Sequence, residues 1–490
     1  MPKKTSSAEQ RRGQAAEWAQ EEAWNVAPLR RLAKELAEMA VDELTRRRGP
    51  VRAPDFQLRT RRLLGRKFHA SEIGAIVEEV RAASLHLCHP RYMAQQVAAP
   101  LPAAALVESV VAAMNQSLAV WRMSPAGTLL DRELAGRFKQ WFGYPAGAEG
   151  SFVPGGSFAN LTALLAARAA LAPQAWRRGQ ARLAVLCGEQ AHYSLRRAAG
   201  ILGLGTQSVF SIALDRERRT DPAAVPAALR AARRAGYRRF ILAGTSGSTP
   251  TSSFDDLEAL AALARAAGAW FHVDAAHGGG MILSPQYRRL LRGIAQADSI
   301  TFDPHKMMFM PLSAGYVLVR DGNALRRAFE QDAPYLFSAL PREVPDLGRF
   351  TIACSQRFES LKVWIALRAY GEAYFGQLTE RVCAVAAAAH AYCLASENLE
   401  PAHRPAANIF CFRLRRRPRD PAASNRLHLA LEEAVNGSGE GYLSSTELEG
   451  ERVLRMVIMN PRSRPEDAIA NLRLVERLAE KERKRKARRL

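Results

Sequence analysis

A lysine follows an apolar segment in Asp298-Ser-Ile-Thr-Phe-Asp-Pro-His-Lys306. The segment predicts a short strand, and α/β sheets bind their ligands at the carboxyl ends of strands. The apolar residues 307–310 come directly after Lys306, and an amine in apolar surroundings loses its charge more easily. A neutral amine can form a Schiff base with a carbonyl group. Taken alone, however, Lys306 fits an ordinary surface lysine better than a reactive one.

A second apolar segment ends in a carboxylate, in Trp270-Phe-His-Val-Asp274. A carboxylate at a strand end can pair with a protonated pyridine nitrogen and keep the ring cationic, which makes the ring a better electron sink. Ala275 and Ala276 are small enough for a flat ring to lie against the backbone, and the glycines at 278–280 permit close approach. The alternative is that Asp274 caps a helix and the glycines form a turn.

Three further segments supply polar groups. The turn that contains Gly156 and Ser157 opens a helical run, and the N–H groups at a helix N-terminus bind anions such as phosphate. His192 begins another helical run and could stack on a planar cofactor, while Thr249 lies in a hydroxyl-rich loop after a strand. The ordinary alternatives are a simple turn, a capping or surface histidine, and a polar loop. Together, the segments supply a phosphate cradle, a stacking ring, a pyridinium partner and a Schiff-base lysine.

Short apolar runs alternate with helical patterns over the middle of the chain. The predicted strands are 183–187, 208–213, 240–243, 270–273, 299–302 and 315–319. Such alternation predicts an α/β fold with a mostly parallel sheet and helices on both faces. The end of the chain predicts a small α+β unit with strands at 409–414 and 453–458 and helices at 425–435 and 465–486. We expect an N-terminal helical segment over 1–100, a large domain over 101–370 and a small domain over 371–490.

Composition excludes several classes of protein. The 490 residues are 48% hydrophobic and 24% charged, which is ordinary for a globular protein and argues against a disordered or fibrous chain. No apolar run approaches the roughly 20 residues that span a bilayer, and the polar start lacks an apolar signal core. The six cysteines form no CxxC pair, which argues against a structural zinc site. We therefore expect a cytoplasmic protein without a membrane partner.

The net charge of +22 arises mostly from arginine and peaks in short runs, the last of them at 481–489. Such charge can attract nucleic acid or anionic metabolites. No basic motif interleaved with aromatic residues accompanies it, so we favour a solvated basic surface over a nucleic-acid partner.

The motifs HVDAAHGGG at 272–280 and ADSITFDPHK at 297–306 are highly specific. With them, the chain resembles the group II pyridoxal-phosphate-dependent amino-acid decarboxylases, which have the aspartate-aminotransferase-like fold (fold type I). The resemblance runs from about Leu87 to Pro461. Supporting matches are HPRY at 89–92, SPA at 124–126, GGSFANLTALLAAR at 155–168, HYSLRRAA at 192–199, GSTPTSSFDDL at 247–257 and RFESLKVW at 357–364.

The resemblance implies a pyridoxal 5'-phosphate cofactor, an L-amino-acid substrate and a homodimer with the site at the subunit interface. It implies decarboxylation to an amine and CO2 through a Lys306 aldimine and a quinonoid intermediate. The implied roles of the site residues are as follows: His192 stacks on the pyridine ring, Asp274 pairs with the ring nitrogen, Ala276 packs on the ring, Gly156, Ser157 and His305 hold the phosphate, and Thr249 lies close to the cofactor.

The chain departs from the family pattern at three places. Asp303 stands where relatives often have asparagine, and a carboxylate near a phosphate is unfavourable unless it points away. His277 stands where an aromatic residue is common. The family's mobile loop often carries a tyrosine that protonates Cα; the stretch 338–355 has none, and we align Leu347 to that position. Because Pro341, Pro345 and Gly348 interrupt any helix, we still expect a mobile loop. Some relatives without this tyrosine produce an aldehyde by oxidative deamination, so this alternative stays open.

The substrate is the least determined feature. GGGMILS, LRGIAQADSIT and PLSAG resemble the branch of L-2,4-diaminobutyrate decarboxylases, whereas PHKMM resembles the glutamate and cysteine-sulfinate branch. Arg91 or Arg357 could meet an acidic substrate, and Asp303, Glu343 or Glu359 a basic one. We expect a diaminobutyrate-like or other polar substrate ahead of an aromatic one.

Overall fold

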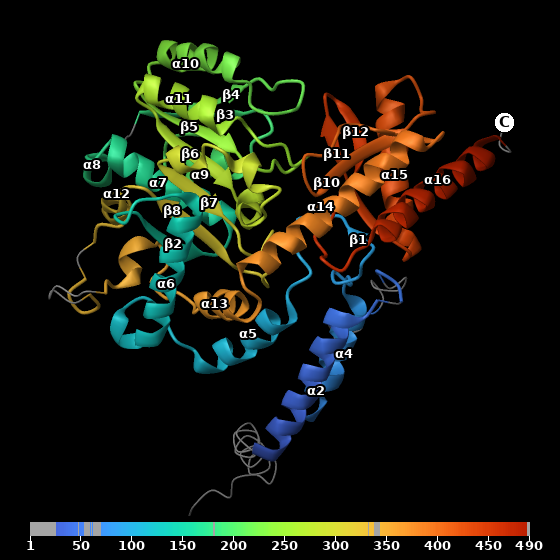
Figure 1. The fold of residues 1–490 in the computed structure, drawn as a ribbon, viewed down its shortest axis with the longest axis horizontal. Coiled ribbons are helices and arrows are strands. Elements are labelled where there is room, and N and C mark those ends of the chain that lie inside the picture. The colour runs from blue at the N-terminus through green and yellow to red at the C-terminus, as the bar shows by residue number, and fades with distance from the viewer. Residues whose placement is uncertain are drawn as a thin grey trace, which may run out of the picture.

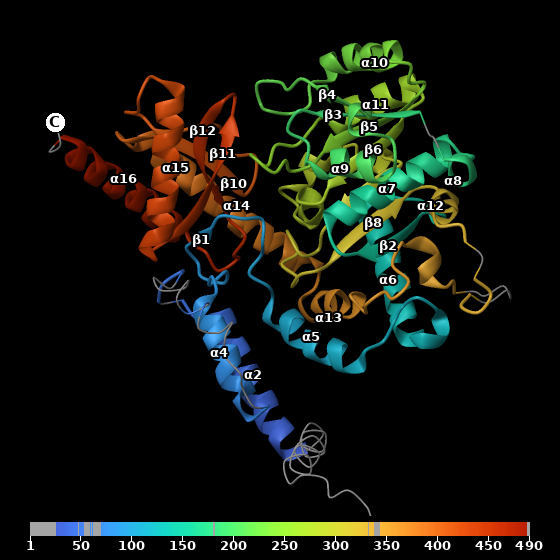
Figure 2. The ribbon, with the colours of Figure 1, turned by 180° about the vertical axis from the view of Figure 1, so that it is seen from behind.

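The computed structural model of the chain describes residues 26–47, 49–52, 59, 61, 70–179, 182–331, 333–337 and 344–487. Two sheets organise these residues, and the long helix α14 (Glu372–Ala395) runs between them in Figures 1 and 2. The larger sheet carries the site, and the smaller sheet, drawn in orange and red in Figure 1 except for one short blue strand, is built mainly from the last part of the chain.

The larger sheet has seven strands in the order β2-β8-β7-β6-β5-β3-β4. They are β2 (Glu149–Val153), β3 (Leu183–Gly188), β4 (Val209–Ile212), β5 (Arg239–Thr245), β6 (Trp270–Ala275), β7 (Ser299–Phe302) and β8 (Gly315–Val319). The neighbours from β7 to β4 pair in parallel, and β8 runs antiparallel to both β2 and β7. The predicted mostly parallel sheet is therefore confirmed, with β2 as a strand that the apolar pattern did not indicate.

Helices cover both faces of this sheet, as the alternation of apolar residues requires. On β3, Val185 packs into a different core cluster from its neighbour Leu186, because successive side chains of a strand point to opposite faces. The surrounding helices are α6 (Pro125–Phe142), α7 (Gly156–Leu171), α8 (Ala175–Arg178), α9 (Ser194–Ile201), α10 (Val225–Arg234), α11 (Leu257–Ala267), α12 (Gly322–Ala328) and α13 (Ser360–Tyr370). Among the described residues, no helix combines the length and the apolar character needed to span a membrane.

The smaller sheet has five strands in the order β1-β11-β12-β10-β9. They are β1 (Tyr92–Met93), β9 (Leu399–Pro401), β10 (Ile409–Leu414), β11 (Tyr442–Leu448) and β12 (Glu451–Val457), and they pack with α14, α15 (Pro421–Ser438) and α16 (Pro465–Ala487). β1 pairs in parallel with β11, so the first hundred residues contribute a strand to the C-terminal sheet. The domain boundaries stay predictions.

The N-terminal helices project from the body of the molecule. In both views α2 (Val26–Thr45) and α4 (Ile73–Ala83) lie side by side as a protruding pair, which we call the N-terminal hairpin (Figures 1 and 2). The next helix, α5 (Pro102–Met114), packs against α13 under the large sheet.

Asp255 ties the end of β5 to a neighbouring loop. Its buried carboxylate accepts hydrogen bonds from the backbone N–H groups of Thr220 (2.7 Å) and Thr245 (2.8 Å) and from the Thr220 hydroxyl (2.7 Å). Thr245 is the last residue of β5, so this carboxylate fixes a strand end at the edge where the site lies.

We expect Asp255→Ala to lower the free energy of unfolding by about 3 kcal/mol, because it leaves buried donors without an acceptor. The neighbouring Asp256, which caps the exposed N-terminus of α11, is a matched control, and Asp256→Ala should cost only about 1 kcal/mol. Thermal unfolding of the two variants measures the difference. Equal losses would contradict a special role for Asp255.

Candidate active site

A cavity of about 490 Å³ lies at the carboxyl ends of β5, β6 and β7. All the site residues that the sequence predicted line it together: Gly156, Ser157, His192, Thr249, Asp274, Ala276, His305 and Lys306. Their backbone segments lie far apart in the sequence, and the parallel register of the sheet brings them to one edge. The roles of these residues in binding and catalysis stay predictions.

Two N–H donors hold the Asp274 carboxylate. Asn160 Nδ2 donates to Oδ2 at 2.8 Å, and the backbone N–H of Ala276 donates to Oδ1 at 3.1 Å. Asp274 is only 6% exposed, so these two donors fix the position of a buried carboxylate. Asn160 is a site residue whose importance sequence reasoning missed. Its only signal was its place one turn into the helix that begins at the glycine-rich segment.

A chain of buried hydrogen bonds fixes the orientation of the Asn160 amide. The hydroxyl of Thr301 donates to Asn160 Oδ1 at 2.6 Å, and His272 Nε2 lies 3.0 Å from the same oxygen. Since the carboxylate of Asp274 can only accept, Asn160 Nδ2 faces Asp274 and Asn160 Oδ1 faces His272. His272 Nε2 therefore carries the proton, and His272 Nδ1 accepts from the Ser299 hydroxyl, to which Trp270 Nε1 also donates.

The same amide group also sets the tautomer of His192. Asn160 Nδ2 donates to Ser194 Oγ at 2.8 Å, so the Ser194 hydroxyl proton is directed to His192 Nδ1, also 2.8 Å away. Burial, as the largest cause, lowers the pKa of His192. The ring is therefore neutral near pH 7 with its proton on Nε2. One amide thus connects the carboxylate of Asp274 to the imidazole of His192.

Asp303 does not point away from the predicted phosphate cradle. Its Oδ2 accepts a hydrogen bond from the backbone N–H of Gly156 at 3.0 Å and lies 3.1 Å from Lys306 Nζ. Oδ1 is buried and has no hydrogen-bond partner within the described residues. The carboxylate therefore neutralises Lys306 and occupies part of the helix N-terminus that the sequence assigned to phosphate.

His305 is held by the segment that leads into β8. Its Nδ1 lies 2.7 Å from the backbone oxygen of Ala314, and burial, as the largest cause, lowers its pKa. The preceding residue, Ser313, accepts a hydrogen bond from the buried Nζ of Lys362 at 2.8 Å. Lys362 thus fixes the backbone next to the group that holds His305.

Arg357 and Glu359, considered above as substrate contacts, instead form an ion cluster with Lys362 and Glu108. Lys362 Nζ lies 2.7 Å from Glu108 and 2.5 Å from Glu359, and Arg357 contacts both carboxylates. Neither Arg357 nor Glu359 lines the cavity. Within the described chain their charges neutralise each other between α5 and α13, and a role for either residue as a substrate contact stays a prediction.

Arg91 also lies outside the cavity lining, and its Nε donates to Asn471 Oδ1 at 3.0 Å. Of the acidic candidates, Asp303 lines the cavity, and Glu343 lies outside the described residues. Asp303 is therefore the only one of these candidates that the described residues bring to the cavity.

His277 lines the cavity and links the two sheets. Its Nε2 lies 2.8 Å from Asn408 Oδ1, and Asn408 Nδ2 donates to the backbone oxygen of Ile458 in the small domain. Because this oxygen fixes the amide, His277 Nε2 carries the proton. Burial, as the largest cause, lowers the pKa of His277 to about 3, so the ring stays neutral.

The predicted loop is described only in part, since residues 338–343 with Pro341 lie outside the described residues. Leu347 begins a 3-10 turn (Leu347–Phe350) and is 2% exposed in a small core cluster, so it is not part of an exposed loop. Immediately before the stretch, the side chain of Tyr335 is 91% exposed. The alignment of Leu347 to the loop tyrosine stays a prediction.

The cavity fits a flat ring that carries a phosphate. A Cβ at Gly156 would lie 2.9 Å from both Ala276 Cβ and Asp303 Oδ2, so only glycine leaves this approach open. Gly155 has φ +108°, which other residues rarely adopt, and it packs against His305. An amine, a carboxylate and an imidazole then face one space with a helix N-terminus at its edge.

The comparisons with known proteins agree with this geometry. Residues 71–415 match the pyridoxal-dependent decarboxylase conserved domain. The chain belongs to this decarboxylase family. Pyridoxal phosphate is its cofactor, and the protein is an amino-acid decarboxylase. When bound, the cofactor supplies an electron sink for the bond that breaks.

Among the relatives of this decarboxylase is the L-2,4-diaminobutyrate decarboxylase of Rhizobium meliloti (strain 1021), 34% identical over 77% of this chain and 75% of that protein. The cysteine sulfinic acid decarboxylase of Mus musculus is 34% identical over 60% of each chain. The crystal structure of mouse CSAD has a TM-score of 0.87 at 26% identity and covers 92% of this chain and 98% of its own. The large-sheet architecture predicted from the sequence is therefore that of the family.

We expect Asp303→Asn to tighten the binding of pyridoxal phosphate about tenfold, because it removes a negative charge from the helix N-terminus that faces the phosphate. Fluorescence titration of the apoenzyme with the cofactor measures the dissociation constant. Asp321→Asn removes the same charge from the N-cap of α12, away from the cavity, and should leave the constant unchanged. Weaker binding by the Asp303 variant would show that the carboxylate is needed to hold Lys306.

Proposed function

We propose that this decarboxylase acts on a polar L-amino acid, with L-2,4-diaminobutyrate as the first candidate, and releases CO2 and the amine. The proposal rests on the polarity of the part of the cavity wall that lies outside the predicted cofactor contacts. That part of the wall includes the uncharged polar side chains of Gln95, Gln96, Tyr193 and His277. Such a wall suits hydrogen-bonding substrates better than an indole or phenyl group.

The electrostatics favour a basic or neutral side chain over an acidic one. Lys306 is the only lysine or arginine among the described residues that line the cavity, and Asp303 neutralises it. The buried Arg455 lies behind Thr249, but it donates to the backbone oxygens of Thr249 and Pro250 at 2.6 and 3.1 Å. Likeness to diaminobutyrate decarboxylases supports the same choice.

The proposed roles follow from the hydrogen bonds. Lys306 would hold the aldehyde group of the cofactor covalently, and Asp274, held in place by Asn160 and Ala276, would pair with the protonated ring nitrogen. His192, neutral and fixed through Ser194, would present its flat face to the ring. Asp303 Oδ2, 3.1 Å from Lys306 Nζ, would orient this amine in the cavity.

The remaining predicted contacts are proposed to bind the phosphate and the ring. Gly156 and Ser157 at the start of α7 and the imidazole of His305 would face the phosphate, while Ala276 packs on the ring and Thr249 lies beside it. The neighbouring Gly155 and Gly156 keep this corner free of side chains.

Tyr335 supports amine as the product. The family resemblance gives a loop tyrosine the task of protonating Cα, and Tyr335, which is 91% exposed, lies beside the predicted loop. The aldehyde alternative rested on the absence of a tyrosine from 338–355 alone.

We also propose a homodimer. Leu106, Val110 and Met114 on α5 are 39%, 52% and 44% exposed, and their spacing of four residues places them on one face of the helix. An exposed apolar stripe of this kind is typical of a subunit interface. A cytoplasmic location remains our proposal, supported by six unpaired cysteines, as in a reducing compartment.

Lys306→Ala should abolish both the visible-edge absorption of the bound cofactor and the release of CO2, since no other lysine among the described residues lines the cavity. The wild-type enzyme is assayed with L-2,4-diaminobutyrate, L-cysteine sulfinate and an aromatic L-amino acid, with CO2, amine and peroxide measured together. We expect the highest kcat/KM with diaminobutyrate, equal amounts of CO2 and amine, and no peroxide. Peroxide with aldehyde would identify the oxidative alternative, and a preference for cysteine sulfinate would overturn the substrate assignment.

Val110→Glu combined with Met114→Glu should convert the dimer to a monomer, because two buried carboxylates in an apolar interface lose their hydration. Size-exclusion chromatography with light scattering measures the mass. Leu429→Glu on α15, where the native leucine is 42% exposed, is the matched control and should leave the dimer intact. A wild-type monomer would refute the proposed interface.

A further inference from the structure

We propose that a second cavity, formed by four arginines at the base of the N-terminal hairpin, binds a small molecule that carries a di- or triphosphate group. The cavity measures about 470 Å³ and is lined by Arg47, Arg381, Arg462 and Arg464 over an apolar floor that includes Val385. We call it the arginine cavity. It shares no lining residue with the decarboxylase cavity, so the proposal does not rest on the function proposed above.

The arginines come from three separate parts of the fold. Arg47 lies just beyond the end of α2, Arg381 lies on α14, and Arg462 and Arg464 lie in the turn between β12 and α16. The guanidinium group of Arg462 donates to the last backbone oxygens of α2, while Arg47 donates to the backbone oxygen of Arg462 at 3.1 Å. The arginines therefore cross-link these segments through neutral oxygens.

Their positive charge is not neutralised by the described part of the chain. None of the four arginines forms an ion pair there, and Arg381 has only a long contact of 3.4 Å with the backbone oxygen of Pro461. Burial, as the largest cause, lowers the pKa of Arg462, and the charge of Arg47 lowers it further. Guanidinium groups stay protonated near neutral pH, so a bound polyanion would relieve this repulsion.

Some other arginine clusters of the described chain are neutralised. Arg413 and Arg417, for example, share the carboxylates of Glu400 and Glu451. In the arginine cavity, no carboxylate among the described residues forms an ion pair with any of the four arginines.

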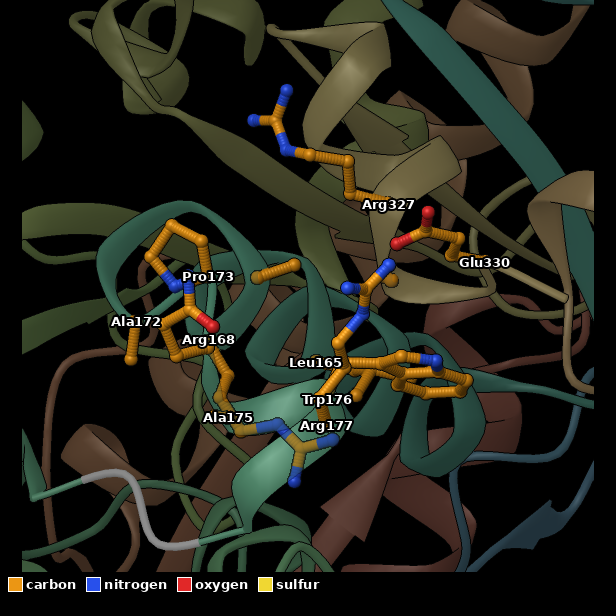
Figure 3. A pocket seen from close by; sticks show the side chains of 12 residues that line it. Leu165, Arg168, Ala172, Pro173, Ala175, Trp176, Arg177, Arg327 and Glu330 are labelled. Atoms are coloured by element: carbon orange, nitrogen blue, oxygen red, sulfur yellow. The ribbon is translucent and has the colours of Figure 1, made fainter.

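A second arginine-lined groove offers a useful contrast (Figure 3). It measures about 180 Å³ and contains Arg168, Arg177 and Arg327, but the carboxylate of Glu330 also lines it. Arg327 lies 3.3 Å from Asp321. This groove is smaller and partly neutralised, so it carries no proposal and supplies control positions.

Charge and volume together indicate the ligand class. Arginine binds phosphate through paired N–H donors, and four arginines exceed what a single phosphate needs. The volume is close to the 490 Å³ of the cavity that accommodates a phosphate ester cofactor. A di- or triphosphate group would bridge Arg47 to Arg381 and Arg464 and so hold the end of α2 against the small domain.

The test uses the full-length holoenzyme, in which the cofactor's own phosphate site is filled. Calorimetry at constant ionic strength measures the binding of pyrophosphate, ATP and adenosine. We expect pyrophosphate and ATP to bind once per subunit and adenosine not to bind; pyrophosphate binding alone would identify an inorganic ligand, and tighter ATP binding a nucleotide. Arg381→Gln combined with Arg464→Gln should weaken binding at least tenfold, because it removes two charged hydrogen-bond donors to the phosphate groups. Arg177→Gln combined with Arg327→Gln removes equal charge from the contrasting groove and should change binding less than twofold.

If the two double variants weaken phosphate binding equally, binding depends only on general surface charge, and the proposal is overturned. Failure of both phosphates to bind, or binding of adenosine as tight as that of ATP, would also overturn it. A second copy of the chain is the other possible occupant of the cavity, and light scattering tests for it. If the Arg381 and Arg464 variant becomes monomeric and the wild type binds no phosphate, the cavity is a contact between subunits. Both double variants keep the residues of the decarboxylase cavity, so unchanged CO2 release shows that they are folded.

Discussion

The hydrogen bond from Asn160 to Asp274 is the constraint on which the rest of the site depends. It keeps a carboxylate in place at the end of β6, and the same amide group orients His192 through Ser194. Buried polar groups must find hydrogen-bond partners, so the orientation of each group in this series of hydrogen bonds determines the orientation of the next. For this arrangement, Asn160 on α7 must face the polar side chains of His272 on β6 and Thr301 on β7. The large sheet is therefore both the scaffold and the source of the site's electrostatics.

Opposite charges neutralise each other in and beside the cavity. Asp303 neutralises Lys306 at the N-terminus of α7, and the cluster of Lys362 with Glu108, Glu359 and Arg357 neutralises itself outside the cavity. Lys362 has one further donor, which it gives to Ser313 next to the residue that holds His305. A buried ion cluster thus adds little charge to the cavity but fixes a backbone segment at its edge.

The small domain takes part in the site through backbone and amide contacts. Asn408, just before β10, fixes the tautomer of His277, and Arg455 on β12 holds the loop at Thr249. Neither was singled out from the sequence, because each acts from another sheet and no short motif contains both partners. The N-terminal segment joins the same domain through β1, which is only two residues long and too short for any periodicity to reveal.

Periodicity by itself determined the strands near Asp274 and before Lys306 and the alternation of helices around them, and the motifs that carry the family resemblance named the residues that meet in the cavity. This succeeded because those features depend on local pattern and on the rule that parallel strands present their carboxyl ends at one edge. Only the tertiary structure decided that Asp303 faces Lys306, that Arg357 and Glu359 turn away from the cavity, and that Asn160 joins two site residues. Side-chain partners depend on which charges and donors meet after folding, and residues hundreds of positions apart, such as Arg47 and Arg462, leave no mark of their proximity in the sequence.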